Sequence, residues 1–131
     1  MGNLSLKMQI DKSTNIILKQ CMSLKPKESC LVVADALTHK IGSALYRNSL
    51  KITKKSRLVL TSIPKSHGAE PPKEIAGEML KYDVVLMSTT KSLSHTRARE
   101  NASRKGARIA SMPGITADMM KRALNTDFNK I

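Results

Sequence analysis

Aromatic side chains are nearly absent from this sequence. It has no tryptophan and only three aromatic residues in 131, namely Tyr46, Tyr82 and Phe128. The core must therefore be filled by aliphatic side chains and by the eight methionines. The same scarcity leaves few rings on which nucleic-acid bases could stack, which argues against a base-stacking nucleic-acid domain.

Cysteine and long apolar segments are also scarce. Cys21 and Cys30 do not form a CxxC pair, so a zinc site built from thiolates is not supported. Cys30 opens an apolar run and is expected in the core as a reduced thiol. No apolar stretch approaches the ~20 residues of a membrane span, and no signal pattern opens the chain. We therefore expect a cytoplasmic protein without membrane contact.

Several nucleotide-binding and catalytic sequence motifs are missing. No GxGxxG or GxxxxGK[ST] follows an apolar run, which argues against a dinucleotide or P-loop nucleotide site. No GxSxG is present, so a serine-hydrolase elbow is not supported. Because no nucleophile–base pair stands out, a stand-alone enzyme with a small-molecule site is the least favoured hypothesis.

Acidic residues are few relative to basic ones. Lys and Arg number 23 against 10 acids, a net charge of +13. Residues 1–65 alone carry 12 basic and 3 acidic side chains. Such an excess favours contact with anions, although it is also typical of a solvated surface that keeps a protein soluble. A free-standing basic nucleic-acid-binding module is therefore kept as an alternative function.

Apolar runs alternate with helical patterns along the chain. Short apolar runs predict strands at 31–34, 57–63, 84–87 and 108–112. Apolar residues at helical spacing predict helices over about 5–22, between 36 and 50, from 71 to 80, from 96 to 105, and over 116–124. The last seven residues, 125–131, are expected to form a polar tail.

This alternation predicts a single α/β domain. Strands separated by helices imply right-handed crossovers and a parallel sheet. We expect a small doubly wound, Rossmann-like three-layer sandwich, with a four-stranded, mainly parallel sheet in the order 2-1-3-4. A ligand would then bind beyond the carboxyl ends of the strands, where the strand order reverses.

The segments after the strands carry the polar groups of this expected site. His39, His67 and His95 are each 28 residues from the next, which places all three at one edge of the sheet with Asp35 and Glu70. One interpretation is a histidine–carboxylate metal site. The favoured interpretation is local hydrogen bonding, because no HxH or HxxxH pair fixes two ligands on one element.

The segment 89–96 is rich in hydroxyl groups and precedes a helix. Its backbone N–H groups and the helix N-terminus could hold a carboxylate or a phosphate. Equally, Ser94 or Thr96 could simply cap the helix. The two interpretations are compatible, and the sequence favours neither.

Three segments together resemble a known family. They are Leu31–Asp35, an apolar strand ending in Asp; Tyr82–Arg99, which contains Lys-Ser-Leu-Ser-His-Thr; and Gly106–Thr116, which contains Met-Pro-Gly-Ile-Thr. They are similar to the N-terminal domain of the thermophilic metalloaminopeptidases, of the leucyl aminopeptidase or aminopeptidase T type, over about residues 10–124.

The resemblance implies a role without catalysis. Members of that family are exopeptidases that release N-terminal residues from peptides, and their metal ligands lie in a C-terminal domain that this sequence lacks. The resemblance thus implies no cofactor in this chain, divalent Zn, Co or Mn in the missing domain, and no activity for the isolated chain. The implied partners are that C-terminal catalytic domain, a peptide substrate and a second copy in a homodimer. The residues expected to line the substrate cavity or the interface are Asp35, His67, Thr89, Ser92, Ser94, His95 and Thr96.

Overall fold

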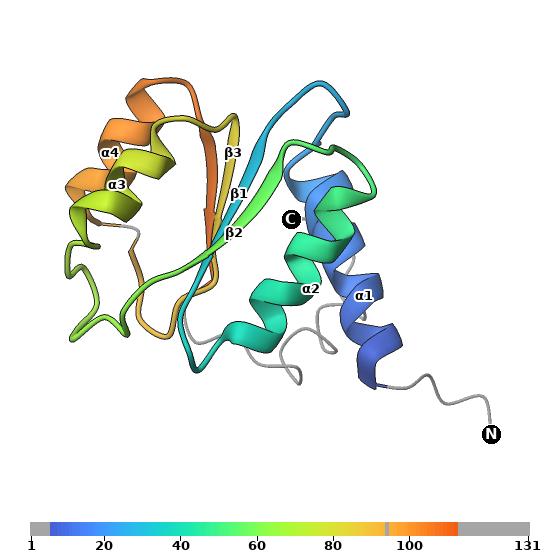
Figure 1. The fold of residues 1–131 in the computed structure, drawn as a ribbon, viewed down its shortest axis with the longest axis horizontal. Helices are drawn as coiled ribbons and strands as arrows, with labels where there is room; N and C mark the ends of the chain where they lie inside the picture. The colour runs from blue at the N-terminus through green and yellow to red at the C-terminus, as the bar shows by residue number, and fades with distance from the viewer. Residues whose placement is uncertain (1–5, 94, 113–131) are drawn as a thin grey trace.

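The protein is an α/β/α sandwich in the computed structural model, which describes residues 6–93 and 95–112 (Figure 1). The elements are α1 (Leu6–Ile16), a π-helical turn η1 (Ile17–Cys21), β1 (Cys30–Ala34), α2 (His39–Leu50), β2 (Ser56–Leu60), α3 (Lys73–Met79), β3 (Val84–Met87), α4 (Arg97–Arg104) and β4 (Arg108–Ser111). The predicted helix over 116–124, the tail 125–131 and the motif Pro113–Thr116 lie outside the described residues.

The sheet is parallel throughout its four strands. Their order is β2-β1-β3-β4, which confirms the predicted fold class and strand order. Cys30 at the start of β1 pairs with Ser56 on one side and with Val84 on the other. Because β1 and β3 are central, all their residues are buried, as the apolar runs predicted.

Alternate residues of the strands face two separate helical layers. One face packs against α1, η1 and α2, and the other packs against α3 and α4 (Figure 1). The first core contains Leu18, Val32, Ile41, Leu45 and Leu86, among others. The second contains Leu31, Val33, Ile75, Met79 and Val85, among others. Both cores are aliphatic, as the shortage of aromatic residues requires.

One glycine sets the distance between α2 and the sheet. A Cβ at Gly42 would lie 2.6 Å from the Cβ of Ala34 on β1, closer than two carbon atoms can approach without displacement. A hydrogen atom in place of a side chain therefore lets α2 lie directly on β1.

Two predicted boundaries were wrong, one because of a neighbouring strand and the other because of a local turn. The second strand ends at Leu60 rather than at residue 63, because its neighbour β1 ends at Ala34 and the last ladder bond runs from Thr61 N–H to the Ala34 carbonyl. The second helix begins at His39 rather than near residue 36. Residues 35–38 instead form a turn in which the Asp35 side chain accepts bonds from the N–H groups of Leu37 and Thr38.

Candidate functional site

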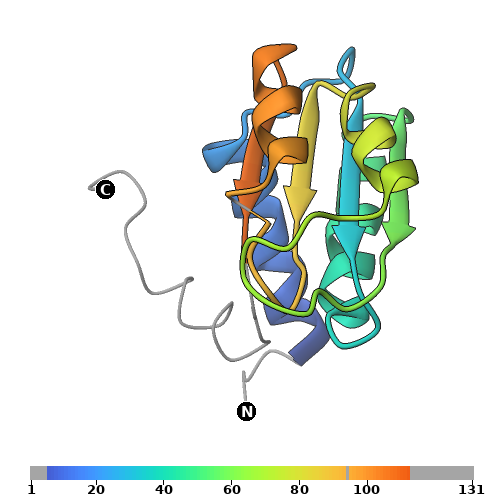
Figure 2. The same ribbon diagram turned by 90° about the vertical axis from the view of Figure 1, so that its left-hand side faces the viewer.

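The carboxyl ends of the strands and the connections that follow them lie together at one end of the sandwich (Figure 2). We call this surface the carboxyl rim and define it as residues 35–38, 61–72, 88–93 and 95–96. The expectation that polar segments after different strands gather at one edge follows from the parallel topology and is met by the described part of the chain.

Asp35 is the centre of the rim. It follows β1 directly and is fully buried. Its Oδ2 accepts a bond from the Thr90 N–H at 2.7 Å, and its Oδ1 accepts one from the Thr90 hydroxyl at 2.8 Å. The N–H groups of Leu37 and Thr38 donate to Oδ1 at 3.0 and 3.2 Å. One carboxylate thus holds the turn after β1 against the connection after β3.

These bonds determine the charge state of Asp35. Burial by itself raises the pKa of the carboxyl, but the donors of Thr90, Leu37 and Thr38 together outweigh burial, so the pKa of Asp35 lies below its ordinary value. The group is an ionised carboxylate at neutral pH and has no direct access to solvent. It is therefore suited to positioning the rim and not to transferring protons with a substrate.

His67 and Ser92 connect the other two segments of the rim. The Ser92 N–H donates to Nδ1 of His67 at 2.9 Å, so the proton of the neutral imidazole is on Nε2. The Gly68 N–H returns a bond to the Ser92 carbonyl at 2.9 Å, and Gly68 has a φ of 83°, which favours glycine there. The imidazole of His67 is exposed while its Nδ1 is used for this link.

The N-terminus of α4 is occupied by the protein's own groups. Thr96 caps the helix by accepting a bond from the Arg99 N–H at 3.1 Å, as one of the two interpretations predicted. Glu70 accepts bonds from the N–H groups of Arg97 and Ala98 at 2.7 and 3.2 Å. A carboxylate does bind at this helix end, as the alternative interpretation required, but it belongs to the chain itself.

The remaining predicted site residues have different surroundings. Thr89 is buried, and its hydroxyl donates to the Lys91 carbonyl at 2.6 Å. His95 is exposed, and Ser94 lies outside the described residues. His39 is exposed and its Nε2 is 3.4 Å from the Ser43 hydroxyl. Within residues 6–93 and 95–112, no group of three His, Cys, Asp or Glu side chains could hold a metal ion.

One small hollow lies at the carboxyl rim. This hollow, between the connection after β2 and Leu93, encloses about 20 Å³, room for roughly one water molecule. Its lining residues are Thr61, Ser62, Pro64, Ala69, Glu70, Pro71, Pro72 and Leu93. This hollow by itself is too small for a peptide or another organic substrate.

Three large apolar side chains are exposed at the rim or directly beside it, a feature the sequence patterns did not single out. Leu37, Leu60 and Ile63 expose 71%, 54% and 45% of their surface. Leu37 follows β1, Leu60 is the last residue of β2, and Ile63 follows β2. Of these two strands, β2 is at an edge of the sheet. Exposed apolar residues that gather in one region are typical of a surface that contacts another domain or protein.

Comparison with known proteins identifies related folds and no family. No protein-family model matches the chain, and no curated protein sequence matches it significantly. Among solved structures, it is similar to 2,5-dihydroxypyridine dioxygenase from Pseudomonas putida KT2440, with a TM-score of 0.70 and 14% identity. It is also similar to AmpT, an aminopeptidase from Thermus thermophilus, with a TM-score of 0.56 and 10% identity.

Both likenesses cover most of this chain and a minor part of the other protein. The first covers 85% of this chain and 35% of the dioxygenase, and the second covers 92% of this chain and 42% of AmpT. At these identities the shared feature is the fold. Because the two proteins are named for different reactions, the fold by itself does not specify a chemistry.

No helix within the described residues is both long enough and apolar enough to cross a membrane.

Proposed function

We propose that this chain is the N-terminal, non-metal-binding domain of a metal-dependent aminopeptidase. It shapes one wall of the substrate cavity with its carboxyl rim and contacts the metal-bearing domain, and it is inactive alone. The observation that carries the proposal is the likeness to AmpT, which spans 92% of this chain and 42% of that protein. The larger part of AmpT therefore lies outside the shared fold.

The rim supports this role because it is held in shape before any partner binds. The carboxylate of Asp35, the imidazole of His67 and the carboxylate of Glu70 each join segments far apart in the sequence. A wall fixed by buried or cross-linking bonds keeps a cavity in one shape, which is what positioning a substrate requires.

The occupant of the apolar side of the rim is, in this proposal, the catalytic domain. Leu37, Leu60 and Ile63 are exposed beside the rim, so a domain covering them would also close the cavity. The resemblance carried by Lys91–Thr96 favours a peptidase over an oxygenase. The metals, Zn, Co or Mn, and their ligands would belong to that second domain, and a homodimer is compatible with the same arrangement.

The proposal is tested by assaying two preparations side by side. The first is the purified 131-residue chain, and the second is the epitope-tagged protein isolated from its own cells with whatever is attached to it. Each is incubated with a leucyl chromogenic substrate and Zn²⁺, Co²⁺ or Mn²⁺. We expect no turnover from the chain alone, and chelator-sensitive turnover from the native preparation.

Variants locate the contact. Leu37→Glu with Ile63→Glu is expected to remove the peptidase activity from the native preparation. Leu80→Glu, at an exposed leucine that follows α3 at the opposite end of the sandwich, is expected to keep it. Turnover by the isolated chain would refute the non-catalytic role. Oxygen consumption with 2,5-dihydroxypyridine and no peptidase activity in the native preparation would assign the domain to an oxygenase instead.

A further inference from the structure

The opposite end of the sandwich is more strongly basic than the carboxyl rim. We call it the amino edge and define it as the segments that precede the strands, residues 22–29, 51–55, 80–83 and 104–107. These segments contain eight basic and two acidic residues, whereas the carboxyl rim, counted over residues 35–38, 61–72 and 88–96, contains two of each. Parallel topology brings all four segments to one end (Figure 1).

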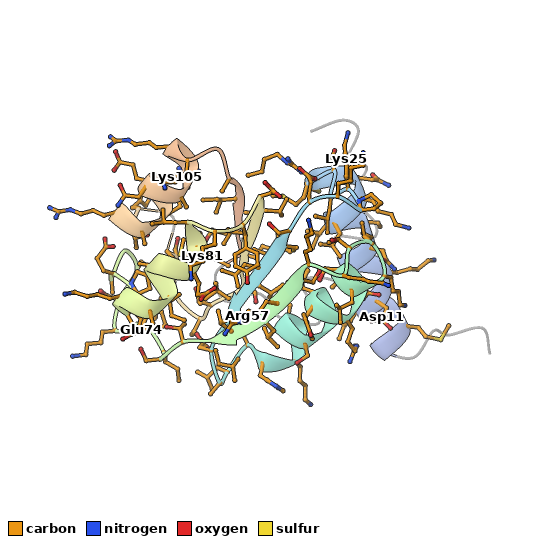
Figure 3. All side chains as sticks on the ribbon, turned by 45° about the horizontal axis from the view of Figure 1, so that its top comes forward. Asp11, Lys25, Arg57, Glu74, Lys81 and Lys105 are labelled. Carbon is orange, nitrogen blue, oxygen red and sulfur yellow. The ribbon has the colours of Figure 1, made fainter. Side chains whose placement is uncertain are left out.

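Arginines and lysines differ in their pairing near this edge. Arg57, Arg104 and Arg108 each form an ion pair with a glutamate, at 3.5, 2.6 and 2.7 Å. Lys81 shares Glu78 with Arg57. Six other lysines are exposed and form no ion pair with any residue that the structure describes. They are Lys25, Lys27, Lys51, Lys54, Lys55 and Lys105. Figure 3 shows Lys25 and Lys105 on opposite sides of the edge.

The helix dipoles offset only part of this positive charge. Helical segments end at this edge at Cys21, Leu50, Met79 and Arg104, so their C-terminal carbonyls face it. Each C-terminus is equivalent to about −0.5 of a charge, or about −2 for all of them. Eight cations and two acids leave an excess of six positive charges. An excess of about four positive charges therefore remains at this edge in the part of the chain that the structure describes.

We propose that the amino edge binds the phosphate backbone of nucleic acid without reading its sequence. Neighbouring strands lie about 4.8 Å apart, so the amino edge, which runs across the starts of four strands, spans roughly 15 Å. This length matches about four phosphates along one strand of a duplex. Lysine ammonium groups on flexible stems suit such contacts, because they act as point charges that need no fixed geometry.

Other anionic partners fit the edge less well. Protein interfaces are depleted in lysine and enriched in arginine and aromatic residues, yet the unpaired cations here are all lysines. Binding in the plane of a membrane requires an amphipathic helix with a large apolar face, and the edge is made of short connections. Tyr82, the aromatic residue of these segments, is partly buried in the second core, so the contact is with phosphate and not with bases.

This inference is independent of the proposed function. The two surfaces lie at opposite ends of the strands. The substitutions expected to abolish one function, at Leu37 and Ile63 or at four lysines of the amino edge, leave the other surface unchanged. Loss of peptidase activity in native preparations would therefore say nothing about nucleic-acid binding, and the reverse also holds.

The test compares two variants of equal net charge. The edge variant carries Lys25→Gln, Lys27→Gln, Lys54→Gln and Lys55→Gln, and the control variant carries Lys12→Gln, Lys40→Gln, Lys65→Gln and Lys73→Gln. All eight lysines are exposed. Binding of the full chain to a labelled DNA duplex of random sequence is followed by fluorescence anisotropy as salt is raised from about 50 to about 200 mM.

We expect wild-type affinity to fall about 100-fold over this salt range, because binding releases the counterions of about four phosphates. The edge variant is expected to bind at least about tenfold more weakly at low salt. The slope of its log affinity against log salt concentration is expected to be smaller than that of wild type by about 3. The control variant is expected to keep both affinity and slope. Unfolding in urea checks that the variants are equally stable.

Three results would overturn the inference. They are the absence of duplex binding at low salt, equal losses in the edge and control variants, and tighter binding to phosphatidylserine vesicles than to the duplex. The second would mean that overall charge is responsible, and the third would assign the edge to a lipid surface.

Discussion

Asp35 and Thr90, 55 residues apart in the sequence, are joined by two hydrogen bonds, one from the backbone N–H of Thr90 and one from its hydroxyl. The two residues follow the two central strands, so this pair fixes the rim at the point where strand order reverses. A single buried carboxylate thus links the stability of the fold to the shape of the candidate site.

Replacement of this carboxylate should be costly. Asp35→Asn keeps the shape of the side chain but presents an NH₂ group to donors that need an acceptor, so we expect a loss of about 2–3 kcal/mol in the free energy of unfolding. Thr90→Val removes only the hydroxyl bond and should cost about 1 kcal/mol. Urea denaturation followed by circular dichroism measures both, and equal effects of the two substitutions would contradict the central role of the carboxylate.

The same group should make stability depend on acid pH. The pKa of Asp35 in the folded protein lies below its ordinary value of 3.8, so its contribution is complete above about pH 4 and is lost as pH falls through the folded pKa. We expect the stability of Asp35→Asn to fall less steeply than that of wild type between about pH 5 and pH 2. The hydrogen bond from Arg108 lowers the pKa of Glu28 too, so part of the slope remains.

The matched control for this titration is Glu74→Gln, at an exposed carboxylate that forms no ion pair with another described residue. Chemical denaturation at each pH supplies the curves. Parallel curves for wild type and Asp35→Asn would show that Asp35 is not the titrating group.

Substitution of two glycines by alanine should change the stability of the protein in opposite directions. Gly42→Ala places a Cβ 2.6 Å from the Cβ of Ala34 and should destabilise the protein by about 1–3 kcal/mol. A Cβ at Gly77, within α3, meets no atom of the described structure within 4 Å, so Gly77→Ala should stabilise it by about 0.5–1 kcal/mol. Adding Ala34→Gly should recover part of the loss at Gly42, and a purely additive double variant would contradict the close contact.

The two thiols should differ sharply in reactivity. Burial raises the pKa of Cys30 to about 12, whereas Cys21 is exposed at the end of η1. Iodoacetamide at pH 8 should modify a single thiol in the folded protein, and both in urea, because the thiolate is the reacting species. Mass spectrometry of the Cys21→Ser variant supplies the control. Rapid labelling of that variant without denaturant would mean that β1 opens readily.

The central elements of the fold could be predicted from the sequence because their signals are local. Leu31–Ala34 and Val84–Met87 are apolar on both faces, and this pattern predicts central parallel strands irrespective of tertiary contacts. The role of Thr96 as a helix cap could likewise be predicted from the residues beside it. The end of β2 was missed because a distant group decides it, since β2 loses its neighbour beyond Ala34. The start of α2 was missed because the turn that Asp35 forms with Leu37 and Thr38 was not recognised.

The candidate site was predictable in position and not in detail. Topology alone places Asp35, His67 and residues 89–93 at one rim. That Glu70 occupies the N-terminus of α4, and that Thr90 is the partner of Asp35, depends on contacts across 27 and 55 residues that no spacing rule reveals. The roles of Asp35, His67, Thr89, Ser92, Ser94, His95 and Thr96 toward a substrate stay predictions.

The division of the two helical layers along the chain has a consequence for biosynthesis. The helical segments α1, η1 and α2 on one face all precede residue 51, and α3 and α4 on the other face follow residue 72. A nascent chain that has just completed β2 can cover one side of β1, while Leu31 and Val33 on the other side stay uncovered until α3 and α4 leave the ribosome. For that interval the half-made protein exposes a bare aliphatic sheet face, the kind of surface that chaperones protect from aggregation.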